Sequence, residues 1–283
     1  MVLFVFIKLN AIQMNKIKSE LVVKSNDLIE ASYYLDLMEQ RILIMAIVDA
    51  RESKKVLNEG FITIEAKRFS QLFGINEKVV YSQLKEAMNT LFNRSVIIKD
   101  IHAESGKQRV NKTRWVSTAS YIDGVGAIQL RFATDIIPFI TRLGECGNFT
   151  AYKLEQIGGM TSIYAIRLYE ILIQYLTIGK RNIDLMWLRE TLQITPDEYP
   201  RLFDLKKRII DVAVNQINLH SDINTTYTQL KKGKIVTNLI FEITQKEKKA
   251  TKTKVKVDDD FINKNALPGE SWSAAQKRLS KNN

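Results

Sequence analysis

The chain has 283 residues, a hydrophobic fraction of 45% and a net charge of +11, enough for two globular domains of ordinary size with a core in each. The single cysteine, Cys146, excludes an intramolecular disulfide, and one cysteine with two histidines argues against a structural zinc site. A basic chain of this size favours a polyanionic partner, either nucleic acid or an acidic membrane surface.

The first nine residues, MVLFVFIKL, are apolar but too short to span a bilayer. No basic segment precedes them and no small-residue cleavage site follows, so they do not resemble a signal peptide. Met14 offers a second start, and we expect residues 1–13 to be dispensable within an N-terminal extension over 1–20. No other apolar run reaches membrane length, which predicts a soluble protein with no membrane partner.

Apolar spacing from residue 21 predicts a first α+β unit over residues 21–143. Ser25 and Asn26 can cap a short helix that ends at Ala31. The predicted elements that follow are helix Leu37–Arg51, strand Phe61–Ile64, helix Ala66–Phe73, helix Glu77–Arg94, strand Ser95–Ile101, strands Arg109–Ile122 and Ala127–Phe132, and a short helix over 134–144. Gly74 directly after the third helix suits a left-handed helix end.

Four apolar residues near the start recur every seven positions: Leu21, Leu28, Leu35 and Ile42. This spacing is compatible with a coiled coil or with ordinary core packing. The segment Ser32-Tyr33-Tyr34 interrupts a continuous helix, so core packing is the favoured interpretation.

A glycine-bearing segment predicts a linker over 144–158, and a second unit then extends over 159–245. Its predicted elements are helix Thr161–Thr177, strand Asn182–Leu185, helix Met186–Leu192, a longer helix and a hairpin. Both halves therefore share one order: long apolar helix, short strand, short helix, longer helix, β-hairpin. This repeat of architecture predicts an α+β chain of two tandem winged-helix domains.

The segment Tyr199–Gln245 predicts a helix followed at once by a hairpin. Pro200 suits the first helical turn, and Asp197 is a candidate cap upstream of it. The apolar face comprises Leu202, Leu205, Ile209, Ala213 and Ile217, and the polar face Arg201, Asp204, Lys207, Arg208, Asp211 and Asn215. The predicted strands Asn224–Leu230 and Ile235–Thr244 enclose the tip Lys231-Lys232-Gly233-Lys234.

Two interpretations fit that segment. In a winged helix, the helix can enter a major groove while the tip contacts phosphate. The alternative is an ordinary α+β unit with a solvated lysine turn. Residues 246–283 begin with KEKKATKTKVK and predict a basic, flexible tail, which either keeps the chain soluble or contacts phosphate without specificity.

Three segments together resemble the replication initiator (Rep) proteins of iteron-containing, theta-replicating plasmids. They are LVVKSNDLIEASYYLDLMEQRILIMAI at Leu21–Ile47, SIYAIRLYEILIQY at Ser162–Tyr175, and DLKKRIIDVAVNQINLHSDI with the basic hairpin and IFEIT after it. The resemblance covers about Leu21 to Gln245. It implies a tandem winged-helix protein that binds directly repeated DNA sites, called iterons, at a plasmid origin and promotes local melting there.

The resemblance further implies a monomer that initiates replication, in equilibrium with a homodimer that represses the protein's own promoter. Host replication initiator and replicative helicase are the implied further partners, and the implied location is the bacterial cytoplasm, with the plasmid DNA. The C-terminal winged helix would contact bases, and the N-terminal one would contact backbone and supply the dimer surface. One departure is Gln216, where the family often has an acidic residue; we expect this position to cap or pack.

The residues expected to contact DNA fall into three groups. On the C-terminal helix they are Arg201, Asp204, Lys206, Lys207 and Arg208; on the wing tip Lys231, Lys232 and Lys234; and in the N-terminal half Lys78, Gln83, Lys85, Arg109, Lys112 and Arg114. Arg201 or Arg208 could bind guanine O6 and N7, and Asp204 could accept from a cytosine N4 amino group. For each residue the alternative is a surface charge with no partner. Trp115 is expected to pack in a sheet rather than to stack on bases.

Residues for catalysis are sparse. His102 and His220 are far apart, so a metal-assisted, tyrosine-based nicking site is not expected. Glu104-Ser105-Gly106-Lys107 lacks the upstream glycine spacing of a phosphate loop, so no ATPase is expected either. We therefore predict a binding protein without metal, cofactor or enzymatic activity. A winged-helix repressor without initiator activity is the second hypothesis, and a DNA-nicking enzyme is the third.

Overall fold

The structure is a computed structural model that describes residues 20–52, 60–101, 104–122, 124–141, 148–247 and 277. All but the last residue of the predicted extension over 1–20, including the expected dispensable residues 1–13, lie outside the described residues, as do Cys146 and nearly all of the predicted tail. The described residues from Glu20 to Gln245 belong to one compact unit. Within the described ranges, no helix combines the length and the apolar character that a bilayer span requires.

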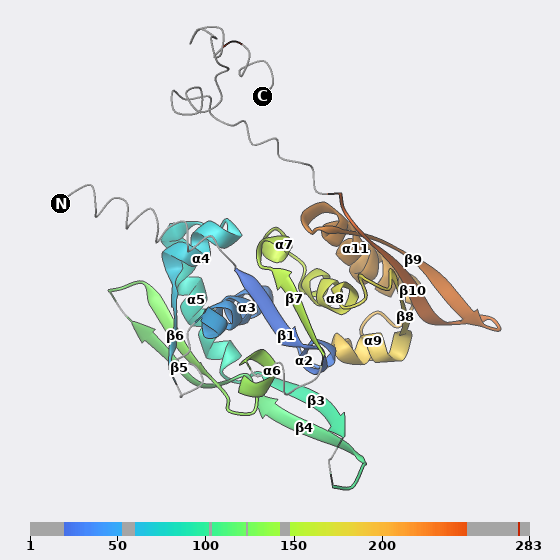
Figure 1. Cartoon of the computed structure of the whole chain (residues 1–283), viewed down its shortest axis with the longest axis horizontal. Helices are drawn as coiled ribbons and strands as arrows, with labels where there is room; N and C mark the ends of the chain where they lie inside the picture. Colours follow the sequence, from blue (N-terminus) through green and yellow to red (C-terminus); the bar gives the residue numbers. More distant parts are fainter. Residues whose placement is uncertain are drawn as a thin grey trace, which may run out of the picture. The chain divides into compact units, whose positions relative to one another are not determined.

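The first half of the unit contains a helix, a strand, two helices and a hairpin (Figure 1). These are α3 (Leu37–Glu52), β2 (Ile62–Glu65), α4 (Ala66–Phe73), α5 (Glu77–Leu91), β5 (Val116–Ile122) and β6 (Ala127–Phe132). The strands form a three-stranded antiparallel sheet in the order β2-β6-β5. Gly74 ends α4 with a φ of 64°, as its position predicted.

A second hairpin is formed by β3 (Ser95–Ile101) and β4 (Gln108–Arg114). It comes before the β5–β6 hairpin in the chain. The prediction of one strand over Arg109–Ile122 was therefore wrong: β4 pairs with β3, and β5 pairs with β6. Trp115 lies between β4 and β5. Its side chain is buried and meets the ring of Tyr33 edge-on at 4.9 Å, which confirms a packing role rather than base stacking.

The second half repeats the order of the first, as predicted. It contains α8 (Ile163–Ile173), β8 (Lys180–Asp184), α9 (Leu185–Thr191), a helix over 202–220, β9 (Ile223–Lys232) and β10 (Ile235–Gln245). Its strands form an antiparallel sheet in the order β8-β10-β9. One layer of helices against a small sheet with a terminal hairpin is the arrangement of a winged helix, here present twice.

Three short elements were not predicted: β1 (Leu21–Ser25), which pairs antiparallel with β7 (Phe149–Lys153), and α7 (Glu155–Gly158). The short helices predicted up to Ala31 and over 134–144 are present as α2 (Asn26–Glu30) and α6 (Ile137–Thr141). Ser25 caps α2 as predicted, since its Oγ accepts from the amide of Leu28 at 3.2 Å. Of the four residues spaced by seven, Leu21 lies on β1, Leu28 on α2 and Ile42 on α3, and Leu35 lies between elements. They do not share one helix, so the coiled-coil alternative is wrong. The boundary at 144–158 stays a prediction.

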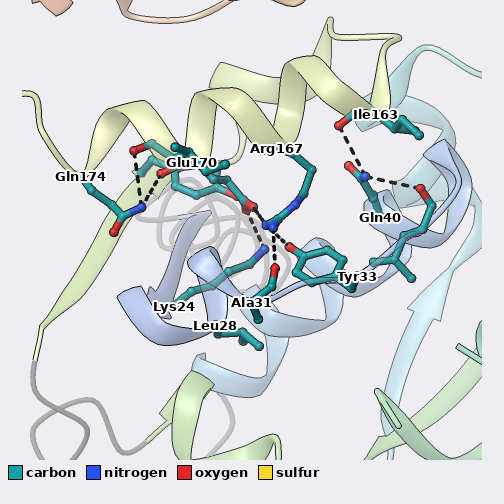
Figure 2. Close-up of polar contacts among 12 residues, drawn as sticks. Lys24, Leu28, Ala31, Tyr33, Gln40, Ile163, Arg167, Glu170 and Gln174 are labelled. Atoms are coloured by element: carbon teal, nitrogen blue, oxygen red, sulfur yellow. Dashed lines mark hydrogen bonds and ion pairs between the residues drawn. The ribbon is translucent and has the colours of Figure 1, made fainter. Parts of the chain in front are cut away.

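A buried polar cluster joins α8 to the N-terminal elements (Figure 2). Lys24 Nζ lies 2.6 Å from Glu170 Oε1, and the Tyr152 hydroxyl donates to the same oxygen at 2.5 Å. The Arg167 guanidinium lies 3.4 Å from Glu170 Oε2, donates to the carbonyl of Ala31 at 2.9 Å and donates to the Tyr33 hydroxyl. Because each charge has a partner, the cluster can stay buried.

Candidate nucleic-acid interface

The helix over 202–220 is continuous but not uniform. It consists of α10 (Leu202–Leu205), a π-helical turn (Lys206–Ile210) and α11 (Asp211–His220), whereas the sequence predicted a regular α-helix. The predicted apolar face is confirmed, because Leu205, Ile209, Ala213 and Ile217 are buried and Leu202 is half-buried. The π turn has an additional residue, which lets Ile209 and Ile210 both face the core.

The start of this helix differs from the prediction. Arg201 occupies the N-cap position, with no side-chain cap, so Pro200 lies outside the first turn and Asp197 is not the cap. Arg189 of α9 instead holds the preceding turn. Its guanidinium donates to the carbonyls of Thr195 at 3.3 Å, of Glu198 at 2.9 Å and of Tyr199. The turn between the two helices is thus fixed from α9.

The predicted groove residues on this helix occupy different environments. Lys207 and Arg208 are exposed. The Arg201 side chain is 79% exposed, and its Nε lies 2.7 Å from Asp204 Oδ2. Lys206 is half-buried, and its Nζ lies 5.7 Å from the centroid of the Tyr227 ring on β9. Three cations of the set therefore face solvent, while Lys206 packs toward the hairpin.

Two contacts fix this hairpin to the helix. The Tyr227 hydroxyl donates to Asp211 Oδ1 at 2.6 Å, and burial together with this bond raises the pKa of Tyr227. Asn218 bonds the backbone of Thr225 on both sides, accepting from its amide at 2.7 Å and donating to its carbonyl at 2.9 Å. These bonds therefore hold the base of the hairpin against the helix. The sequence predicted neither contact, because both depend on the register of β9 against the helix.

The hairpin tip is basic and exposed, as predicted. Gly233 turns the chain with a φ of 64°, and Lys232 is paired in register with Ile235. Figure 1 shows this β9–β10 hairpin extending past the helices. The three lysines Lys231, Lys232 and Lys234 are all exposed. Amines on a projecting hairpin can reach phosphates beside a groove that the helix occupies.

The N-terminal candidates are distributed over two separate elements. Lys78 and Gln83 are exposed on α5, but Lys85 is half-buried, with its Nζ 5.1 Å from the centroid of the Tyr121 ring. Arg109, Lys112 and Arg114 are exposed on β4, which belongs to the β3–β4 hairpin and not to the β2-β6-β5 sheet.

Strand alternation separates these three side chains further. Lys112 and Arg114 share one face of β4, and Arg109 lies on the other. Arg114 also contacts the residue that follows α5, because its guanidinium donates to the carbonyl of Phe92 at 3.2 Å. Arg109, Lys112 and Arg114 on β4 therefore do not form one cluster with Lys78 and Lys85 on α5.

Phe203 was missed by the sequence analysis. It lies on the helix beside Arg201 and Asp204, and its side chain is 67% exposed. The available signal was an aromatic residue outside the apolar series of Leu202, Leu205 and Ile209. Among the residues described, no group of three His, Cys, Asp or Glu side chains comes close enough to hold a metal ion.

Comparisons with known proteins match both halves of the chain. The family described as "Initiator Replication protein, WH1" matches residues 21–173, and "Initiator Rep protein, WH2" matches residues 184–243. A curated relative, the "Uncharacterized 27.6 kDa protein" of Escherichia coli, is 24% identical over 228 residues, which are 77% of this chain and 93% of that protein.

A solved structure is also similar: the Pi initiator protein, in a crystal structure in complex with iteron DNA. It superposes with a TM-score of 0.66 at 21% identity, over 82% of this chain and 99% of that chain. At this identity the likeness concerns the fold. Together with the two family matches, it confirms the prediction of two winged-helix domains.

Proposed function

The chain belongs to the initiator Rep protein family, and from this premise we propose that it binds directly repeated DNA sites, or iterons, at a plasmid origin. The observation that carries the proposal is the basic end of the C-terminal winged helix. Exposed Arg201, Lys207 and Arg208 on the helix combine with the lysine tip of the hairpin. The similar Pi initiator protein has been crystallised with iteron DNA, which supports this partner.

In the proposed complex the helix lies in a major groove, where its N-terminal residues meet base edges. The tip lysines neutralise phosphates and release counterions, which supplies affinity without sequence information. The bonds from Asp211 to Tyr227 and from Asn218 to Thr225 keep helix and tip at one spacing. This preorganisation lowers the entropic cost of binding both groups at once.

The proposal extends to the steps that follow binding. Binding energy is used to bend and destabilise adjacent A·T-rich DNA, and the host initiator and replicative helicase then load there. A dimer represses the protein's own promoter, while the monomer acts at the origin in the bacterial cytoplasm. No step requires a catalytic residue, metal or cofactor. This account is supported by family membership and by the chemistry of the basic surface.

A footprint on the DNA that flanks its own gene tests the proposal. The purified chain is applied at two concentrations and near-physiological salt. Protection in a ladder of direct repeats, spaced by one or two helical turns of about 10.5 base pairs, is the expected result. Protection of only one palindrome over the promoter would instead assign the chain to the repressor alternative. Incubation with supercoiled DNA and Mg²⁺ should leave the DNA supercoiled, whereas relaxation would indicate a nicking enzyme.

A further inference from the structure

Phe203 is a large apolar side chain that lies outside the core. Its neighbours Leu202 and Leu205 point toward the core, but the Phe203 ring is 67% exposed. A single exposed apolar residue is ordinary on a protein surface, so exposure alone carries no conclusion. The position of Phe203 is informative, because the ring lies in the first turn of the helix that we place in the major groove.

Two cations lie near the ring in the chain, and one of them, Arg201, is paired with Asp204. Lys207 lies one turn along the helix, with its Nζ 5.8 Å from the Phe203 centroid, and the Arg201 side chain lies just before the helix. A two-fold symmetric contact between two copies through Phe203 would bring these cations against their own equivalents, which is unfavourable. A polyanion with an apolar group is the complementary partner.

The major groove presents one such apolar group, the C5-methyl of thymine. We propose that Phe203 contacts a thymine methyl group and thereby helps to determine the sequence of the repeat. This role rests on the proposed function, since it requires the helix to occupy the groove. Phe203 would add a requirement for thymine beside the hydrogen bonds that Arg201 or Arg208 can make to guanine.

Deoxyuridine tests this contact, because it differs from thymidine only by the methyl group. The probe is the duplex protected in the footprint, with each dT replaced by dU in turn, and binding of the full chain is measured at fixed salt. We expect a roughly fourfold loss of affinity at one position, the equivalent of burying one methyl-sized group. Phe203→Ala should bind the unsubstituted duplex more weakly and show no further loss at that position.

Leu219→Ala is the matched control, because Leu219 is also exposed but lies at the other end of the same helix. This variant should keep the sensitivity of the unaltered chain to dU. Two results would overturn the contact although the chain binds DNA. One is equal affinity for every dU duplex, and the other is a loss of affinity at the dU position that persists in Phe203→Ala. If no duplex is protected at all, the proposed function fails and the contact fails with it.

A separate observation concerns a cavity of about 10 Å³ lined by Lys24, Tyr33, Gln40, Trp115 and Glu170. Two buried atoms on its lining side chains, Gln40 Oε1 and Trp115 Nε1, have no hydrogen-bond partner among the residues that the structure describes. Gln40 Nε2 donates to the carbonyls of Leu35 at 3.4 Å and Ile163 at 3.5 Å, and these two contacts assign the amide orientation, which leaves Oε1 as the acceptor. One side chain therefore offers a donor and another an acceptor.

We infer that this cavity holds one ordered water molecule, which accepts from Trp115 Nε1 and donates to Gln40 Oε1. The volume suffices for a single water, and two polar partners meet the minimum for a stable site. A crystal structure that shows ordered solvent tests the site directly. Density within hydrogen-bonding distance of both atoms is expected. A dry cavity, or a water that contacts neither atom, would overturn the inference.

Discussion

Lys24 and Glu170 are 146 positions apart in the sequence, yet Lys24 Nζ lies 2.6 Å from Glu170 Oε1 (Figure 2). Their side chains are only 4% and 1% exposed. The pair connects β1, at the start of the described chain, to the middle of α8. A charge this deeply buried is tolerated only with a partner, so each residue depends on the other for its place in the fold.

The first prediction concerns Glu170→Gln. The change keeps the shape but leaves Lys24 and Arg167 buried without their carboxylate, so the free energy of unfolding should fall by about 3–5 kcal/mol. Urea denaturation of the full chain measures the loss. Glu155→Gln is the matched control, because Glu155 pairs with Lys153 at 3.3 Å on the surface, with side chains 64% and 69% exposed. Its effect should stay below about 1 kcal/mol. Equal effects of the two variants would contradict the buried pair.

The second prediction is acid lability. Burial alone would raise the pKa of Glu170, but Lys24 and Arg167 outweigh burial and hold it below the ordinary value of 4.5. A carboxyl whose pKa is lower in the folded state contributes its full stability above the unfolded pKa. That contribution disappears as pH falls through the folded value. The free energy of unfolding should therefore decrease below about pH 4.5, and Glu170→Gln should decrease less steeply. Parallel pH profiles would contradict this assignment.

Local sequence patterns predicted the helices and their inward faces well. Leu205, Ile209 and Ala213 recur at a spacing of four, which places them on one helix face, and all three are buried. The π turn was not predictable in this way, since it depends on how Ile209 and Ile210 are accommodated by the core. The break at Trp115 was missed for a similar reason: an unbroken run of strand-forming residues does not show that its two ends pair with different partners.

The candidate interface was predicted in composition but not in geometry. The sequence identifies Lys206 and Lys85 as basic, but only the packing shows their amines over the rings of Tyr227 and Tyr121. The same holds for Lys24, which resembles any other lysine until α8 brings Glu170 to it. Burial of a charge is a property of contacts between distant segments, which local periodicity does not report.

The third prediction follows from Gln216, whose Oε1 accepts from the amides of Thr161 and Ser162, each at 2.9 Å, just before α8. The expectation that this position caps or packs is confirmed. The N-cap of α8 is Ser162, whose Oγ accepts from the amide of Ala165 at 3.4 Å. Gln216→Ala removes the further bonds at this helix start and should cost about 1 kcal/mol of stability, the typical net value of a hydrogen bond. Gln216→Glu should stay close to the unaltered chain, because a carboxylate accepts the same bonds near a helix start. The midpoints of urea denaturation measure the stability of both variants. If Gln216→Glu is as costly as Gln216→Ala, the contact does not act as a cap.

The fourth prediction concerns the lysine tip and depends on the proposed function. Lys232→Ala removes an exposed cation from the hairpin, so it should weaken binding to all DNA sequences about equally. The slope of log K against log salt should become shallower by about 1. Titrations at several salt concentrations measure both effects. Lys153→Ala, an exposed lysine on β7, is the control and should leave the slope unchanged. Loss of specificity at one base pair would contradict a phosphate contact.

The last prediction separates two roles for Asp204. As a direct partner of cytosine, Asp204 would contact a different base pair from Arg201, and the losses in Asp204→Ala and Arg201→Ala would add. The structure favours the other role, because Asp204 Oδ2 already accepts from Arg201 Nε at 2.7 Å and so orients the guanidinium.

We therefore expect both variants to relax specificity at the same base pair, by about 1–3 kcal/mol for Arg201→Ala. The double variant should be no worse than Arg201→Ala alone, since an orienting residue has nothing left to orient. Binding to duplexes with each base pair changed in turn measures the pattern, and Lys153→Ala again serves as the control. Additive losses at two different base pairs would assign Asp204 to the DNA itself.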